Sequence, residues 1–435
     1  MMASCKSPYE PREDSTLLER YVREQAYGDV LDMGTGSGIQ AIAAAQSSKV
    51  ESVLATDIQK SAIGYCRKCI KHKKIQFFVS DLFKNIQNIK EIKAKKIKTG
   101  KFDTIIFNPP YLPDELKVRD LTLEGGKKGY EAIEMFLSEV NGFLKPDGII
   151  LIVFSSLTKK EKVDEFIRNN LLEYELLEKQ HYFFEDLYVY KIKKSGILNE
   201  LDKHNVKNIK YFAKGKRGFV FTASCRGGKI AVKINNPESK AAMRMENEAK
   251  FLKLLNKKGI GPKLLFQGDD FLAYKFAEGG SIMEFLSISA FKKSPIKKTN
   301  KDSNNKNNNK TVINNKAIIK NKKIIINTIK KIMKQLYEMD KLKIEKREMS
   351  HPQKHIIIDK KNNPTLIDFE RCRYKLNPGN VTQFCDFLTS GHVSSILSGE
   401  NITIKKDALI DAARLYKKNQ NNLNYKKIIK IIENG

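Results

Sequence analysis

The strongest constraint on the fold is the alternation of short apolar runs with helical patterns between residues 9 and 194. Five of these runs have the β-branched and aromatic composition of buried strands: DVLDMG (29–34), SVLATD (52–57), KIQFFVSD (74–81), FDTIIFNPPY (102–111) and GIILIVF (148–154). Strands separated by helices are joined by crossovers, which make neighbouring strands parallel. The segment therefore predicts an α/β domain with a mixed, mostly parallel sheet.

The remaining sequence predicts a second, smaller α+β domain. A chain of 435 residues is too long for one ordinary core. We expect a first domain at 8–194, a linker at 195–205 and a second domain at 206–435, where IKYFAKGKRGFVFTA and KIAVKI are typical of antiparallel strands. Residues 292–323 are rich in Lys and Asn and poor in large apolar side chains. That composition predicts a disordered insertion.

The formal net charge of +30 has two explanations. Clustered cations release counterions from phosphates, so the charge can mark a contact with RNA or a ribosome. Lysine, however, greatly outnumbers arginine, and abundant Asn and Ile accompany it. This pattern is typical of codon drift in an AT-rich genome, and both explanations stay open. Because no apolar run approaches membrane-spanning length and no signal-type segment begins the chain, we expect a cytoplasmic protein without membrane contact.

A glycine-rich turn follows the first predicted strand. Asp32 ends that strand, and Gly34, Gly36 and Gly38 lie before a predicted helix. Glycines let the backbone approach a ligand closely, and the N-terminus of the helix presents unpaired N–H groups. The turn is therefore a candidate binding site for a nucleotide-like cofactor.

Carboxylates end the next two predicted strands. Asp57 lies roughly 20 residues beyond the turn, a spacing that suits hydrogen bonds to ribose hydroxyls. Asp81 can reach an adenine amino group, with Leu82 against the ring. Together these residues indicate an adenosine-containing cofactor.

The sharpest motif is Asn108-Pro109-Pro110-Tyr111 at the end of the fourth predicted strand. An amide or aromatic amine nitrogen is a poor nucleophile because its lone pair is delocalised. The Asn108 side-chain oxygen and the Pro109 carbonyl can accept its two N–H bonds and hold it in line for attack. The two prolines stiffen the loop, and Tyr111 can stack on a planar substrate group. The motif thus predicts N-methylation.

The motifs YEPREDSTLL, LDMGTGSG, ATD, SDLF, NPPYLP and GGKKGYEAIEMFL resemble those of the HemK-type class I methyltransferases. The resemblance covers residues 8–190 and is strongest to the archaeal and eukaryotic release-factor branch. It implies a Rossmann-like domain that uses S-adenosylmethionine and methylates the glutamine amide of a GGQ motif in a translation release factor. It also implies a small zinc-binding activator protein as partner.

The resemblance also implies which residues contact the cofactor or its methyl-bearing end. Carried over by position, they are Ser15, Asp32, Gly34, Asp57, Asp81, Leu82 and Asn108. Ser15 stands where that family usually has threonine, and Asp32 where glutamate is common. Both are mild departures.

A methyltransferase of nucleic-acid N6-adenine is the main alternative, because such enzymes share the NPPY loop. They must act on a single strand or extrude a base. No added target-recognition segment is evident between Tyr111 and Leu198, which favours the protein substrate.

The second domain resembles the compact RIO-like predicted archaeal Ser/Thr kinases over residues 205–435. Gly215 and Gly218 lie between two strand-like runs, Lys233 follows on a strand, Glu248 on a helix, and Asp368 stands in LIDFE. The resemblance implies that the glycines cover ATP phosphates, that Lys233 pairs with Glu248, and that Asp368 binds Mg²⁺.

The predicted kinase departs from the usual catalytic motif. Ser350 occupies the position of the catalytic aspartate, and His355 that of the second metal-binding asparagine. Glu348 is a candidate relocated base. A pseudokinase that binds without transferring phosphate is therefore an alternative, and a translation-associated binding protein is another.

Overall fold

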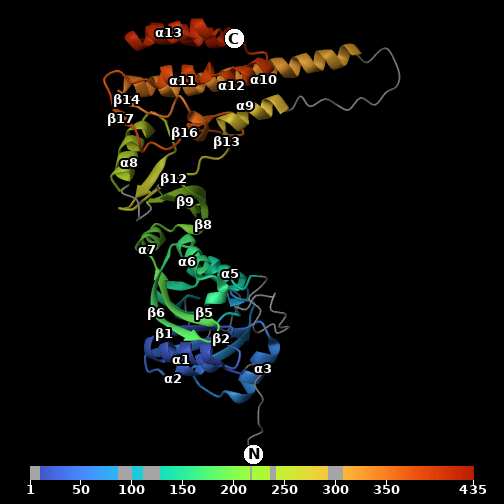
Figure 1. Ribbon diagram of the computed structural model, residues 1–435, viewed down its shortest axis with the longest axis vertical. Helices are drawn as coiled ribbons and strands as arrows, with labels where there is room; N and C mark the ends of the chain where they lie inside the picture. Colours follow the sequence, from blue (N-terminus) through green and yellow to red (C-terminus); the bar gives the residue numbers. More distant parts are fainter. Residues whose placement is uncertain (1–9, 87–99, 111–127, 216–217, 236–241, 292–306) are drawn as a thin grey trace, which may run out of the picture. The chain divides into compact units, whose positions relative to one another are not determined.

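The computed structural model describes residues 10–86, 100–110, 128–215, 218–235, 242–291 and 307–435. It divides into two compact units, Met1–Tyr211 (unit 1) and Phe212–Gly435 (unit 2) (Figure 1).

Unit 1 is built on a seven-stranded sheet. Its strands are β1 (Gly28–Met33), β2 (Val50–Asp57), β3 (Ile75–Val79), β4 (Phe102–Phe107), β5 (Leu144–Ser155), β6 (Leu172–Tyr182) and β7 (Glu185–Lys194). The strand order is β3-β2-β1-β4-β5-β7-β6, and β7 alone runs antiparallel to its neighbours. The predicted mixed, mostly parallel sheet is confirmed.

Helices cover the sheet of unit 1. They are α1 (Glu13–Gln25), α2 (Ile39–Gln46), α3 (Lys60–Cys69), α5 (Glu131–Glu139), α6 (Lys160–Asn169) and α7 (Gly196–Lys203). α1 and α2 lie side by side in Figure 1 and contact each other. Buried Ala41, Ala44 and Ala45 of α2 have small side chains, which let this helix approach the core beneath Val30 and Val53.

The segment predicted as a linker, 195–205, contains helix α7. The Ser195 side chain accepts a hydrogen bond from the backbone N–H of Leu198, a typical N-cap. Leu198 and Leu201, three residues apart on one helix face, are buried. Local capping and a short apolar stripe therefore give this segment regular structure.

Unit 2 begins at Phe212, within the edge strand of a five-stranded sheet. Its strands are β8 (Lys207–Lys214), β9 (Gly218–Cys225), β10 (Gly228–Asn235), β11 (Leu264–Gln267) and β12 (Phe271–Lys275), in the order β11-β12-β10-β9-β8. The β9–β10 pair is antiparallel, as predicted, and β10–β12 and β11–β12 are antiparallel pairs that the sequence analysis did not predict. Helix α8 (Ala242–Asn256) contacts β11 and β12.

The rest of unit 2 is mainly helical. Its helices are α9 (Ile282–Phe291), α10 (Asn307–Lys341), α11 (Asn380–Leu388), α12 (Gly391–Gly399), α13 (Lys406–Lys418) and α14 (Asn422–Glu433). Short strands accompany them: β13 (Gly280–Ser281), β14 (Ile344–Glu345), β15 (Ile356–Ile358), β16 (Pro364–Leu366) and β17 (Arg373–Tyr374). β15 and β16 form an antiparallel pair. Ile329, Ile332 and Leu336 of α10 pack into one core with Phe384 of α11.

The predicted disordered insertion differs from the structure in its second half. Residues 292–306 lie outside the described residues, but α10 begins at Asn307, inside the segment 292–323. Once a packed helix exists, each added residue gains a backbone hydrogen bond at low cost, and lysine is a good helix former. Among the helices that the structure describes, none combines the length and apolar character that a bilayer span needs.

Candidate active site

The glycine turn between β1 and α2 adopts backbone angles that favour glycine. The φ angles of Gly34, Gly36 and Gly38 are 69°, 52° and 84°. A Cβ atom on Gly38 would lie 2.3 Å from Cδ1 of Ile70, a side-chain end that can move, so the positive φ is the main reason that glycine is favoured there. On the other side, a Cβ on Gly34 would be 3.9 Å from the carbonyl oxygen of Asn108. The turn therefore faces the predicted acceptor loop.

Asp32 is a buried carboxylate at the end of β1. Its side chain is 1% exposed, and Thr35 Oγ1 donates a hydrogen bond to Asp32 Oδ2 at 2.6 Å. Burial raises the pKa of Asp32 to about 7, and the nearby Asp57 carboxylate adds to the rise. A cationic ligand group beside it would favour its ionised form.

Asp57 lies at the end of β2 and contacts the glycine turn. The backbone N–H groups of Gly36 and Gln59 donate to its two oxygens at 2.9 and 2.8 Å. A carboxylate has about four acceptor positions, so both oxygens keep capacity for ribose hydroxyls.

Asp81 and Leu82 follow β3. Asp81 forms an ion pair with Lys84 near the surface. Leu82 has a positive φ of 43°, and its carbonyl oxygen accepts a hydrogen bond from Ser80 Oγ at 2.7 Å. A branched residue held at positive φ carries backbone strain, which is commonly found at ligand sites.

Asn108 lies directly after β4 and is held in one orientation. Its Nδ2 donates to Asp14 Oδ2 and to Ser15 Oγ, both at 3.2 Å. An ionised carboxylate can only accept, so Asp14 fixes which end of the amide points toward it. The other end, Asn108 Oδ1, is buried, and no donor of the described residues reaches it. A buried acceptor without a partner is costly, so this atom is poised for an incoming N–H group.

Asp14 contacts the predicted site through Asn108, and the motifs did not single it out. It is 4% exposed in the first turn of α1, next to the predicted Ser15. The available signal was a carboxylate adjacent to Ser15 at a helix start.

Tyr111 lies outside the described residues, and Pro109 is buried beside Asn108.

The predicted residues gather because β1 to β4 are parallel neighbours. Met33 of β1 is in register with Thr56 of β2 and Phe107 of β4. The glycine turn, Asp57 and Asn108 therefore follow at the same carboxyl edge of the sheet, where open α/β sheets bind ligands.

Two exposed aromatic residues lie at this edge too. β5 and β6 both pair antiparallel with β7, so β6 runs in the direction of β5 and ends at the carboxyl edge. Phe183 and Phe184 form the β6–β7 turn and are 93% and 95% exposed. Phe183 has a φ of 33°, which bulky residues rarely adopt. Sequence reasoning missed this surface, because no motif marks it.

Comparisons with known proteins agree with this site. Residues 12–184 match the family described as "Methyltransferase small domain". A Methanocaldococcus jannaschii protein named "Putative protein N5-glutamine methyltransferase" is 36% identical over 165 residues, which are 36% of this chain and 77% of that protein. The chain belongs to the methyltransferase small-domain family. The HemK-like part of the sequence resemblance is thereby confirmed.

Other relatives of this methyltransferase are similar over shorter shares of their length. A Rickettsia prowazekii "Bifunctional methyltransferase" is 32% identical over 34% of this chain and 29% of that protein. A Burkholderia pseudomallei "Ribosomal protein uL3 glutamine methyltransferase" is 28% identical over 31% and 47%. Among solved structures, the E. cuniculi Mtq2–Trm112 complex is 23% identical over 43% of this chain and 98% of that chain, with a TM-score of 0.34.

Unit 1 is thus a methyltransferase that depends on S-adenosylmethionine, and all family-matched residues lie within it. The positive-φ glycine turn, the buried Asp32 and the strand-end Asp57 fit this cofactor. Asp81 and Leu82 lie at the same edge.

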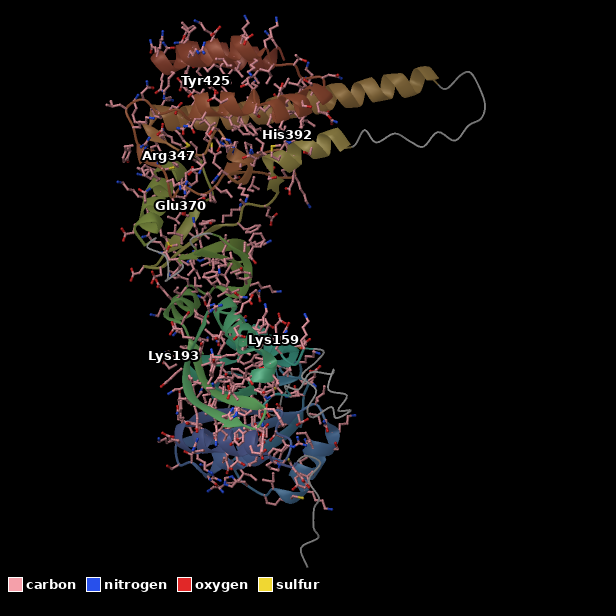
Figure 2. All side chains as sticks on the ribbon, viewed as in Figure 1. Lys159, Lys193, Arg347, Glu370, His392 and Tyr425 are labelled. Atoms are coloured by element: carbon pink, nitrogen blue, oxygen red, sulfur yellow. The ribbon has the colours of Figure 1, made fainter. Side chains whose placement is uncertain are left out.

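Unit 2 contains a separate cluster of charged side chains around Lys233 of β10. Lys233 Nζ is 2.6 Å from Glu248 Oε2 of α8 and 3.3 Å from Asp368 Oδ1. It is also 3.6 Å from Glu370 Oε2, a residue labelled in Figure 2. Burial alone would lower the pKa of Lys233, but the carboxylates of Glu248 and Asp368 outweigh it and raise that pKa.

The remaining predicted residues of unit 2 flank this cluster. His355 Nδ1 is 3.8 Å from Asp368 Oδ2, and burial lowers the pKa of His355. Glu348 Oε2 is 3.4 Å from the Nζ of Lys346, a fully buried lysine that the sequence did not single out and that also donates to the Asp368 carbonyl.

The two glycines of the predicted phosphate loop are held by backbone contacts. Gly215 N donates to the Gly218 carbonyl at 2.8 Å. A Cβ on Gly218 would lie 2.1 Å from the Ile234 carbonyl oxygen, so strand packing alone requires glycine there.

Proposed function

We propose that unit 1 methylates the side-chain amide nitrogen of a glutamine in a protein, and that the acceptor is the GGQ glutamine of a translation release factor. The observation that carries this proposal is the buried Oδ1 atom of Asn108 beside the glycine turn, which has no donor among the residues that the structure describes. Asp14 and Ser15 hold this amide so that its oxygen faces the acceptor.

Residues of unit 1 would hold the substrate amide and the cofactor in the positions that methyl transfer needs. S-adenosylmethionine supplies an electrophilic methyl group on a sulfonium. Asn108 Oδ1 accepts one N–H bond of the substrate amide, and the Pro109 carbonyl accepts the other, which aligns a weak nucleophile with the methyl group. Asp57 binds the ribose, and Asp32 provides negative charge near the positively charged cofactor.

Two further observations support a protein acceptor. Relatives at 36% and 28% identity carry the names of glutamine methyltransferases. The exposed Phe183 and Phe184 offer apolar surface at the catalytic edge, which suits a folded substrate better than a small molecule. A small zinc-binding activator belongs to the proposal because the release-factor branch that the sequence resembles works with one.

The proposal is tested by incubating the full chain and labelled S-adenosylmethionine with release factor, tRNA or DNA, each with and without the activator. We expect label only in the release factor, located by mass spectrometry on the GGQ glutamine and absent when that glutamine is replaced. Label in tRNA or DNA instead would overturn the proposal in favour of adenine methylation.

We propose in addition that unit 2 is a RIO-like kinase domain that binds ATP–Mg²⁺. The specific observation is the buried Lys233–Glu248 ion pair with Asp368 beside it, since this arrangement positions a lysine for the α/β-phosphates. Asp368 and His355 would hold Mg²⁺ together with phosphate oxygens. Gly215 and Gly218 would cover the phosphates, and Glu348 would act as base if phosphate is transferred.

A further inference from the structure

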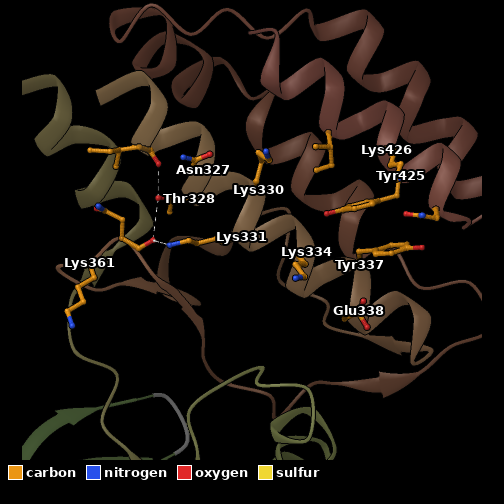
Figure 3. A pocket seen from close by; sticks show the side chains of 14 residues that line it. Asn327, Thr328, Lys330, Lys331, Lys334, Tyr337, Glu338, Lys361, Tyr425 and Lys426 are labelled. Atoms are coloured by element: carbon orange, nitrogen blue, oxygen red, sulfur yellow. Dashed lines mark hydrogen bonds between the residues drawn. The ribbon is translucent and has the colours of Figure 1, made fainter. Parts of the chain in front are cut away.

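A groove of about 670 Å³ lies in unit 2 between the C-terminal half of α10 and α14 (Figure 3). It is separate from the Lys233 cluster, since none of that cluster's residues line it. Its lining combines lysines and aromatic rings, which is unusual for a simple packing gap. Five lysines line it: Lys330, Lys331, Lys334, Lys361 and Lys426.

The charge of the groove is poorly neutralised. Lys330 pairs with Glu433. Among the described residues, the acceptors of Lys331 are neutral: the Asn362 carbonyl at 3.2 Å and Asn363 Oδ1 at 2.8 Å. Within the described part of the chain, Lys334, Lys361 and Lys426 form no ion pair, and all three are exposed. The groove therefore keeps an excess of positive charge for an anionic ligand.

The single carboxylate in the lining does not remove this excess. Glu338 is 2.8 Å from Lys341 Nζ, one turn along α10 and outside the lining. Its charge is thus already balanced by a lysine that does not belong to the groove.

Exposed lysines also occur on other surfaces, for example Lys253, Lys257 and Lys258 on and after α8. The groove differs from such surfaces because its lysines surround two tyrosine rings within one concavity. This combination of cations and aromatic rings is the feature that points to a ligand.

The aromatic part of the groove is a stacked pair of rings. Tyr337 of α10 and Tyr425 of α14 stack with their ring centroids 4.1 Å apart and their planes 7° apart (Figure 3). Burial raises the pKa of Tyr425 to about 12, so its phenol is neutral and does not repel a phosphate. Bases stack on such rings whatever their sequence.

The spacing of the lysines along the groove suits a polymer of phosphates better than a single anion. Lys330 and Lys334 are four residues apart on α10, which places them about 6 Å apart along the helix axis. Lys361 comes from the β15–β16 turn and Lys426 from α14, so the cations line the groove from three elements. A chain of phosphates can contact several of them at once.

We propose that this groove binds single-stranded nucleic acid, with phosphates on Lys334, Lys361 and Lys426 and a base against the Tyr337–Tyr425 pair. Lysines along a groove with an aromatic platform are the combination that binds single strands without sequence preference. Binding here does not depend on methyl transfer or on ATP.

The test measures binding of the full chain to short fluorescent oligouridine over a series of salt concentrations. In the variant K334Q/K361Q/K426Q, the slope of log affinity against log salt should fall by about 2. The matched control is K253Q/K257Q/K258Q, three exposed lysines on and after α8, and it should keep the wild-type slope. Equal slopes in the two triple variants, or no binding at physiological salt, would overturn the proposal.

The aromatic platform is tested separately. Tyr425→Phe should bind as the wild type does, while Tyr425→Leu should weaken binding roughly 5- to 100-fold. A duplex of the same length should bind more weakly, and equally tight duplex binding would overturn the single-strand assignment. A parallel oligodeoxyuridine measurement shows whether the ribose contributes, and tight binding of either single strand supports the proposal.

Discussion

The candidate sites of the two units differ in whether their central polar group has a hydrogen-bond or ion-pair partner. In unit 1, Asn108 is fixed through its Nδ2 atom, but its Oδ1 atom is left without a donor among the described residues. In unit 2, Lys233 is surrounded by the carboxylates of Glu248, Asp368 and Glu370. One site has an open acceptor, whereas the other is closed by internal ion pairs.

Whether the central group has a partner affects which kind of ligand, neutral or charged, each site would bind. An open neutral acceptor suits a neutral N–H donor such as an amide, because no charge has to be displaced. A lysine bound to three carboxylates exchanges partners only with a ligand of comparable charge, such as a phosphate accompanied by a cation. The difference therefore favours the proposed uncharged amide as the substrate group of unit 1 and the proposed charged nucleotide as the ligand of unit 2.

The largest expected effect comes from removing the open acceptor. Asn108→Ala should lower the methylation rate roughly 10²–10³-fold, because the substrate amide loses an aligning hydrogen bond. Cofactor affinity, measured by calorimetry, should change little. Asn85→Ala, an exposed asparagine of unit 1, is the control. Near-normal turnover in Asn108→Ala would show that the open acceptor has no part in the reaction.

The Lys233 cluster of unit 2 is tested by measuring whether ATP–Mg²⁺ stabilises the protein against thermal unfolding. A ligand that binds only the native state at ~100 times its Kd adds ~2.7 kcal/mol to the free energy of unfolding. ATP–Mg²⁺ should therefore raise the melting temperature of the wild type, and Lys233→Met should abolish that rise while methylation continues. Lys253→Met on the exposed face of α8 should behave as the wild type.

Because Lys233→Met leaves three carboxylates without their lysine, the variant can also unfold. Asp368→Asn removes a single charge and should reduce the ATP–Mg²⁺ effect with less loss of stability. If ATP–Mg²⁺ leaves the wild type unchanged, the kinase assignment of unit 2 is wrong.

A third effect depends on pH and concerns unit 1 alone. The pKa of Asp32 is about 7, so its carboxylate gains a proton as the pH falls through that value. Affinity for the positively charged cofactor should then decrease, by up to about tenfold per pH unit below the pKa. Calorimetric titrations across this range should show the slope, and Asp32→Asn should remove it. A pH-independent affinity would exclude Asp32 from cofactor binding.

The stability of unit 1 should change with pH in the opposite direction. Folded Asp32 holds its proton more tightly than the unfolded chain does, so its stabilising contribution is complete at low pH. That contribution is lost as the pH rises through about 7.

The smallest expected effect concerns the exposed aromatic turn. Phe183→Ser combined with Phe184→Ser should raise the KM for a folded protein substrate roughly tenfold, because apolar contact area is lost. The rate with a short glutamine peptide should stay unchanged. Leu423→Ser, at a residue of unit 2 that is 65% exposed, provides the control. Equal losses with the protein and the peptide would mean that the turn stabilises the active site instead of binding substrate.

Much of the fold of unit 1 could be predicted because the sequence patterns that specify it are local. The strand–helix alternation, the glycine turn and the position of Asn108 at a strand end are each encoded in a few consecutive residues. Side-chain periodicity and the backbone angles of glycine act over the same short range. These features followed from the sequence by itself.

The tertiary structure decided which side chains meet. Asp14 contacts Asn108 across 94 positions, and Lys233 contacts Asp368 across 135. The stacked tyrosines of the groove come from two helices that only packing brings together. Such contacts depend on how whole elements bury their apolar faces, and no local pattern records that geometry. The sequence by itself determined the chemistry at each strand end, while packing decided which acceptor was left open and which lysine was enclosed.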